Sequence, residues 1–172
     1  MEDRSISRHI LVCGIRTGIN TFVRPLRAKS LQTPLPIVIL VTEAPKPDVW
    51  ESINRFPLIY IVIGSALKPH DLERAGIHHC HSVVILANFS NIENLEDGMM
   101  DADTIFIYKT IRHKEPNVKI IVELTSVGTI SFLSGSKSFK KSAKNMKGSY
   151  FTCDMFAAGE VYLPNMLDTL VC

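Results

Sequence analysis

Gly14, Arg16 and Gly18 follow an apolar run near the start of the chain and have the residue types of a phosphate-binding turn. A dinucleotide-binding turn of the form G-x-G-x-x-G uses three glycines so that the backbone can approach a pyrophosphate at the N-terminus of a helix. Only two glycines are present here, and the side chains of Ile15 and Arg16 stand where the phosphates would bind. Glu43, just after a second apolar run, is placed to accept the hydroxyls of a ribose. We therefore expect a turn of this type that has lost its dinucleotide.

Gly14, Arg16, Gly18 and Glu43 are thus the candidate cofactor-binding residues, should the chain hold a nucleotide. Arg16 has two further interpretations: it contacts the phosphate of a mononucleotide, or it is a solvated arginine. We expect no cofactor, with nucleotide binding as the alternative.

Four histidines, His70, His78, His79 and His81, lie close together in the sequence. A metal ion needs ligands that converge on one point with tetrahedral or similar geometry. Neighbouring histidines in a loop point in different directions, so we expect surface or interface histidines that titrate near neutral pH. No metal-binding residues are predicted.

Two charged clusters are the remaining candidates for a binding site. The acidic cluster lacks the spacing of an EF-hand and precedes an expected helix, so it indicates a solvated helix end, with a hard cation as the alternative. The basic cluster indicates a solvated linker, with nucleic acid or anionic lipid as alternatives. The clusters are Glu93, Glu96, Asp97, Asp101 and Asp103, and Lys137, Lys140, Lys141, Lys144 and Lys147.

Composition narrows the class of protein. The chain has 172 residues, 46% of them hydrophobic, which is enough to bury the core of one domain. A net charge of +2 gives no general affinity for nucleic acid, and no apolar run reaches the length that spans a bilayer. The four cysteines form no CxxC pair and are expected to be reduced thiols. We find no nucleophile elbow, P-loop or paired carboxylates, so we expect a domain that is not an enzyme.

Alternating strands and helices must position these residues. Apolar runs predict strands that are buried in a parallel sheet, and the segments between them carry helical spacing. Pro25 predicts a short or kinked first helix, and Pro45 and Pro47 predict a loop over 42–48. The order predicts an α/β fold, a Rossmann-like doubly wound parallel sheet with right-handed crossovers. The predicted strands are 9–13, 37–41, 58–63, 82–87 and 118–124, and the predicted helices are 19–29, 49–54, 69–75 and 101–114.

The pattern changes after residue 125. We expect a Rossmann-like core over 1–125, a flexible insert rich in lysine, serine and glycine over 126–149, and the start of a helical subdomain over 150–172. This C-terminal helical appendage is predicted as an apolar helix from Phe156 to Leu170. The chain ends within an apolar pattern, so we expect it to be a fragment of a longer protein.

Several segments together resemble the RCK domains of potassium channels, most of all the second RCK domain in the gating ring of large-conductance calcium-activated (Slo-type) channels. The resemblance covers about residues 9–124 and 150–172. It includes an unusual first helix that contains a proline, matched here around Pro25. The segments that carry it are His9–Cys13, Phe22–Ala28, Gly64–Leu72, Val84–Asn88, Phe156–Gly159 and Leu167–Leu170.

The resemblance implies a cytoplasmic regulatory domain that couples ligand or ion sensing to the opening of a potassium pore. The implied partners are another RCK domain, in the same or another chain, and the pore module; no nucleic acid is expected. The implied location is the cytoplasmic face of a membrane, reached only through the parent channel. Two alternatives stay open: a nucleotide-sensing regulatory subunit of the KTN or TrkA-like type, and a fragment of a Rossmann oxidoreductase.

One departure from the family pattern concerns calcium. In the calcium-activated members, a run of aspartates called the calcium bowl lies just before the segment matched by Phe156–Gly159. Here that stretch is rich in lysine, and Asp154 is the acidic residue nearby. Lysines repel a divalent cation, so we expect the calcium-bowl site to be absent.

Overall fold

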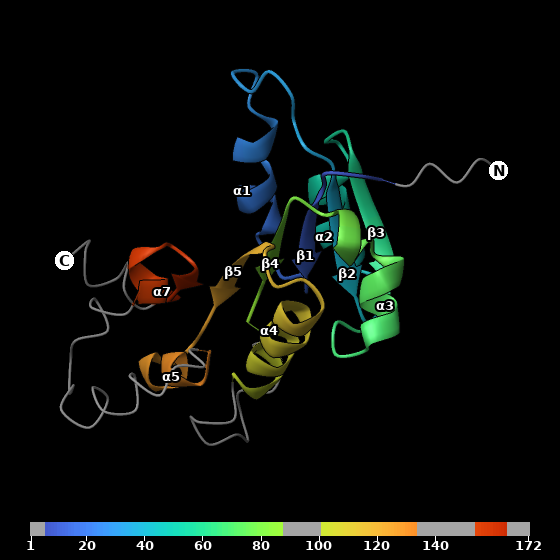
Figure 1. Ribbon diagram of the computed structural model, residues 1–172. Helices are drawn as coiled ribbons and strands as arrows, with labels where there is room; N and C mark the ends of the chain where they lie inside the picture. The colour runs from blue at the N-terminus through green and yellow to red at the C-terminus, as the bar shows by residue number, and fades with distance from the viewer. Residues whose placement is uncertain (1–5, 88–100, 134–153, 165–172) are drawn as a thin grey trace.

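The chain folds around one six-stranded sheet, seen in a computed structural model that describes residues 6–87, 101–133 and 154–164. All strands are parallel and lie in the order β3-β2-β1-β4-β5-β6 (Figure 1). The order reverses between β1 and β4, which is the arrangement of a doubly wound sheet. The strands are β1 Ile10–Cys13, β2 Ile37–Val41, β3 Ile59–Ile63, β4 Ser82–Ile85, β5 Lys119–Glu123 and β6 Val161–Tyr162.

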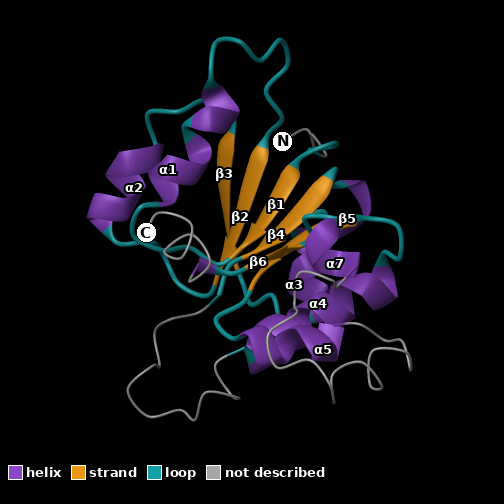
Figure 2. Ribbon diagram, turned by 90° about the vertical axis from the view of Figure 1, so that its left-hand side faces the viewer, coloured by secondary structure: helices purple, strands orange, loops and turns teal. Residues whose placement is uncertain are grey.

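Helices cover both faces of the sheet (Figure 2). On one face α1 (Ile19–Val23) and α2 (Pro47–Ile53) enclose a cluster of buried aliphatic side chains. On the other, α3 (Pro69–Arg74), α4 (Ala102–Lys114) and α5 (Ile130–Leu133) enclose a second cluster. Every residue of β1 and β2 is buried, as strands with helices on both sides require. The predicted Rossmann-like doubly wound sheet is confirmed.

Proline sets the limits of two helices. The expected kink is present, because α1 ends at Val23 and a 3₁₀ turn, Pro25–Arg27, replaces the next helical turn. The expected loop over 42–48 is too long by two residues, because α2 begins at Pro47. A proline at the first position of a helix is favourable, since the amide hydrogen that it lacks would have no partner there.

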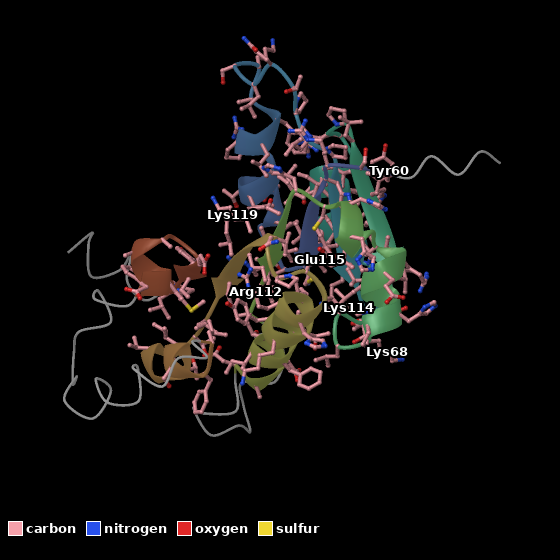
Figure 3. All side chains as sticks on the ribbon, viewed as in Figure 1. Tyr60, Lys68, Arg112, Lys114, Glu115 and Lys119 are labelled. Atoms are coloured by element: carbon pink, nitrogen blue, oxygen red, sulfur yellow. The ribbon has the colours of Figure 1, made fainter. Side chains whose placement is uncertain are left out.

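The third strand departs from the prediction that the strands are fully buried. β3 lies at the edge of the sheet, and its residues are half-buried or exposed. Tyr60 and Ile63 are both exposed, and Tyr60 is labelled in Figure 3. The apolar run 58–63 has the composition of a central strand, but the strand order of the sheet makes it an edge strand.

The predicted helix from Phe156 to Leu170 is wrong over much of its described part. A short helix, α7 (Asp154–Ala157), ends before Gly159, which has a φ of +69°. The chain then forms β6, which pairs with β5 in parallel. Val161 and Leu163 are buried while Tyr162 between them is exposed, so the segment has the two-residue period of a strand. The appendage therefore extends the sheet, and residues 165–172 lie outside the described structure.

The first part of the expected insert is ordered and packed. A 3₁₀ turn, Val127–Thr129, leads directly into α5, and Ile130 and Leu133 are buried in the core. These two apolar side chains are spaced as in a helix, but the serine and glycine around them favoured the prediction of a flexible insert. The basic cluster lies outside the described residues, as does the stretch 88–100 with Glu93, Glu96 and Asp97. Among the helices that the structure describes, none is both long and apolar enough to cross a membrane.

Candidate functional site

A cleft of about 490 Å³ opens at the carboxyl ends of the central strands. Its walls are the turns that follow β1, β2 and β3, the residues after β4, and one side of α4 near its first turn. In a doubly wound sheet, ligands bind at this edge, next to the point where the strand order reverses. The cleft is therefore the candidate functional site.

Three of the four predicted site residues come together here. Gly14, Arg16 and Glu43 line the cleft, whereas Gly18 is absent from its lining and precedes the first residue of α1. Gly14 has a φ of +99° and Gly18 a φ of +84°, which is a conformation that favours glycine at both positions. The two glycines thus shape the turn after β1, and Gly14 alone lies in the cleft wall.

Arg16 is bound to the protein itself. Its Nη1 atom lies 2.6 Å from Oε1 of Glu123, at the end of β5. The other oxygen of Glu123 accepts a hydrogen bond of 3.2 Å from the backbone amide of Ala87, just after β4. The side chain of Glu123 is 4% exposed and that of Arg16 is 45% exposed. The Glu123 carboxylate therefore joins the turn after β1 and the segment after β4 to the end of β5, and two of its partners, Arg16 and Ala87, line the cleft.

Glu123 was missed in the sequence, although a signal was present. It ends the run Lys119–Glu123, in which the three central residues are apolar. A carboxylate at the end of a buried parallel strand needs a partner, because an unpaired charge is rarely buried. The carboxyl ends of neighbouring strands meet at one edge, so Arg16 was within reach.

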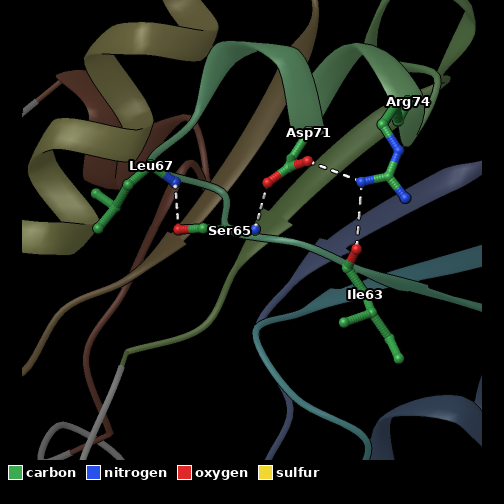
Figure 4. Close-up of polar contacts among 5 residues, drawn as sticks. All are labelled: Ile63, Ser65, Leu67, Asp71 and Arg74. Carbon is green, nitrogen blue, oxygen red and sulfur yellow. Dashed lines mark hydrogen bonds and ion pairs between the residues drawn. The ribbon is translucent and has the colours of Figure 1, made fainter.

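A second carboxylate, Asp71 of α3, holds the wall of the cleft formed by the turn after β3 (Figure 4). Asp71 accepts a hydrogen bond of 2.9 Å from the backbone amide of Ser65 and one of 2.8 Å from Arg74 Nη1. The Ser65 amide, with Arg74, holds the pKa of this carboxyl below its usual range. A Cβ atom on Gly64 would lie 2.7 Å from Asp71 Cγ, so the close approach requires glycine there.

Asp101 corrects the view of the acidic cluster as a solvated helix end. It is fully buried just before α4, and its carboxylate accepts four hydrogen bonds. The donors are the amide and hydroxyl of Thr125, at 2.9 and 2.8 Å, the amide of Ser126, at 3.0 Å, and the hydroxyl of Thr129, at 2.6 Å. Asp103 is exposed and lines the cleft. Asp101 therefore ties the start of α4 to the turn before α5.

Comparison with known proteins places this architecture in a family. The family model for the calcium-activated potassium channel slowpoke-like RCK domain matches residues 5–122, which is more than half of the chain. The chain belongs to the Slo-like RCK family. It is 33% identical to potassium channel subfamily T member 1 of chicken (Gallus gallus) and 32% identical to the human protein (Homo sapiens), each over 167 residues. Each match covers 90% of this chain and 14% of the relative, so the RCK chain spans about one seventh of these channel proteins.

Solved structures give the same assignment. The RCK chain is 25% identical to a structure of the human SLO3 gating ring, with a TM-score of 0.75, over 99% of this chain and 31% of that one. A structure of the GsuK channel bound to NAD is 19% identical, with a TM-score of 0.53, over 77% of this chain and 20% of that one. At that identity the likeness to GsuK concerns the fold alone.

The four clustered histidines of the RCK chain are exposed, as expected for surface residues. His78 Nδ1 lies 2.5 Å from Oε1 of Glu115, and Lys114 Nζ lies 2.5 Å from Oε1 of Glu73. Both pairs join the α3 region to the C-terminal end of α4, where Figure 3 labels Lys114 and Glu115. Within the described ranges, no group of three potential metal ligands comes together.

Two neighbouring helices of the RCK chain each present an exposed phenylalanine. Phe106 of α4 is 58% exposed and Phe132 of α5 is 60% exposed. The two helices pack against each other on one face of the sheet (Figures 1 and 2). Val127, just before α5, is also exposed. We call Phe106, Val127 and Phe132 the α4–α5 surface.

Proposed function

We propose that this chain is a regulatory gating-ring domain of a potassium channel, which couples the sensing of an ion or ligand to pore opening. The observation that carries the proposal is the match of 99% of the chain to a gating-ring structure, together with membership of the Slo-like RCK family. The chain acts by changing conformation rather than by catalysis. A ligand shifts such a domain only through different affinities for its two states.

The proposed location is the cytoplasmic face of a membrane, which the domain reaches through the parent channel and its pore module. The net charge of +2 gives no reason to expect nucleic acid as a partner. We also propose a Rossmann-like core over 1–125, an insert over 126–149 and a C-terminal segment from 150, whose described part adds β6 to the core sheet. The buried side chains of α5 join the first part of the insert to the core.

The proposed partner is another RCK domain, bound at the α4–α5 surface. Phenylalanine is enriched in the centres of protein interfaces, where burial of its ring supplies much of the binding free energy. Phe106 and Phe132 leave more than half of their surface in water in the single chain. A partner that covers both rings removes this apolar area from solvent.

Sedimentation velocity over a range of protein concentrations tests the pairing. We expect the wild-type chain to associate, and the variant F106S/F132S to weaken its dimer affinity by about tenfold or more. The control Y60S replaces another exposed aromatic residue, on the free edge of β3, and should associate like the wild type. A wild-type chain that stays monomeric at high concentration, or an equal loss in Y60S, would contradict the proposed surface.

Calcium is not the proposed ligand of the lysine-rich stretch. Five lysines between 137 and 147 repel a divalent cation by Coulomb forces. Isothermal titration of calcium into the chain should give no binding at micromolar concentration. A one-site isotherm that is lost on replacement of Asp154, but kept on replacement of the cleft residues, would refute the expectation.

A further inference from the structure

We infer that Arg16 closes the phosphate-binding turn of the cleft, so that this Rossmann-like domain selects against ligands that carry a pyrophosphate. The inference concerns the cleft of the single chain and does not depend on the proposed pairing or on the parent channel. The inference rests on the position of Arg16 in the turn, on its ion pair with Glu123, and on the burial of Glu123.

The position of Arg16 is the first step. In a dinucleotide-binding turn, the second glycine follows the first by two residues and lets the pyrophosphate approach the backbone. Arg16 stands two residues after Gly14, so a long cationic side chain replaces that glycine. The side chain lines the cleft and ends 2.6 Å from Glu123 Oε1. It therefore passes from the turn after β1 to the end of β5, across the place where the phosphates would lie.

The burial of Glu123 explains why Arg16 stays in place. The Glu123 side chain is 4% exposed, and the Ala87 amide is its other hydrogen-bond donor within the described ranges. If Arg16 turned toward a phosphate, a buried carboxylate would keep a single neutral donor. Arg16 is half-exposed, but Glu123 is buried, and taking the counter-ion from a buried charge is unfavourable because that charge has lost both water and its partner. The pair thus opposes any ligand that must displace Arg16.

The rest of the cleft keeps features of a nucleotide site. Gly14 retains a positive φ, and Glu43 lines the cleft after β2, where an acidic residue accepts ribose hydroxyls. Removal of the ion pair should therefore permit binding rather than only damage the fold. Glu123 has to be neutralised in the same variant, so that no unpaired charge is left behind.

The experiment titrates NADH into the intact chain and follows nicotinamide fluorescence. We expect no saturation for the wild type, and a dissociation constant at least about tenfold lower for R16G/E123Q than for the wild type. K46A removes another positive charge from the cleft lining but leaves the turn closed, so it should behave like the wild type.

Three results would overturn the inference. The first is that the wild type binds NADH as tightly as R16G/E123Q does. The second is that K46A gains as much affinity for NADH as R16G/E123Q. The third is that R16G/E123Q gains no affinity although its circular dichroism and melting show that it is folded. If R16G/E123Q does not fold, R16A/E123Q is judged by the same criteria, because alanine restricts the turn more than glycine does.

Discussion

Each of three interior polar side chains is stabilised in a different way. Glu123 pairs with a cation, and Asp101 accepts four hydrogen bonds. His9 is fully buried with Nε2 3.0 Å from the carbonyl oxygen of Ala75, while its Nδ1 finds no hydrogen-bond partner among the described residues. Desolvation is the largest cause that lowers the pKa of His9 below 6.5, so the neutral form is favoured. Glu123 is thus held by an ion pair and Asp101 by hydrogen bonds, whereas burial favours the neutral form of His9.

We expect acid to destabilise the chain through His9. The folded state has the lower pKa, so the unfolded state binds more protons as pH falls through about 6.5, and the free energy of unfolding decreases. The loss stops below the folded pKa and amounts to about 1.4 kcal/mol for each unit between the two values. Urea unfolding between pH 8 and pH 5 measures it.

The variant H9Q keeps a donor for the Ala75 carbonyl but does not titrate, so its profile should lose this part of the slope. H81Q changes an exposed histidine and should keep the wild-type profile. A wild-type profile that is unchanged in H9Q would mean that another group carries the pH dependence.

At the scale of elements, the strands of the central sheet are predictable because their side chains are buried on both faces. The runs 37–41 and 119–123 are continuous and apolar in their centres, and each forms a strand. The helix predicted after Phe156 was wrong because the apolar residues there fit both a helix and a strand. Gly159 in a left-handed conformation and pairing with β5 decide for the strand, and pairing depends on residues far away in the sequence.

The same distinction applies to the site. Gly14, Arg16 and Glu43 line one cleft because each follows a parallel strand and the carboxyl ends of parallel strands meet at one edge; their binding of a ligand stays a prediction. Glu123 was not found, because its role depends on which strand lies beside β4, and sequence order does not give strand order. Asp101 was misjudged because an acidic residue near a helix start looks the same whether its hydrogen-bond donors are water or Thr125.

The contacts of Asp101 predict a large effect of its removal. D101A removes the acceptor of four hydrogen bonds, from the half-buried Thr125 and Ser126 and from the buried Thr129 hydroxyl, so the free energy of unfolding should fall by about 3 kcal/mol. The matched control is D103A, two residues further along in an exposed position, with a change within about 0.5 kcal/mol. Equal losses in urea unfolding of both variants would show that Asp101 acts only through its charge near the helix start.

For the whole molecule, the chain has two surfaces with different properties. The cleft lies at the carboxyl ends of the strands, and Arg16 in its wall pairs with Glu123 at the end of β5. The α4–α5 surface lies on one face and exposes phenylalanine rings. A domain that responds to a signal and passes it to a partner needs two such regions, joined by a stiff element. Here α4 lines the cleft near its first turn and carries Phe106.

The most direct test of the regulatory role replaces the matching segment of chicken potassium channel subfamily T member 1 with this chain and records potassium current in excised patches. We predict that the chimera reaches the cell surface, conducts potassium, and changes its open probability when the composition of the intracellular solution is changed. The variant F106S/F132S should reduce this response. The control carries the TrkA-N domain of the Escherichia coli inner membrane protein ybaL, which shares the fold at 14% identity, and should be silent. A chimera that reaches the surface but does not respond, or a control that responds equally well, would contradict the account.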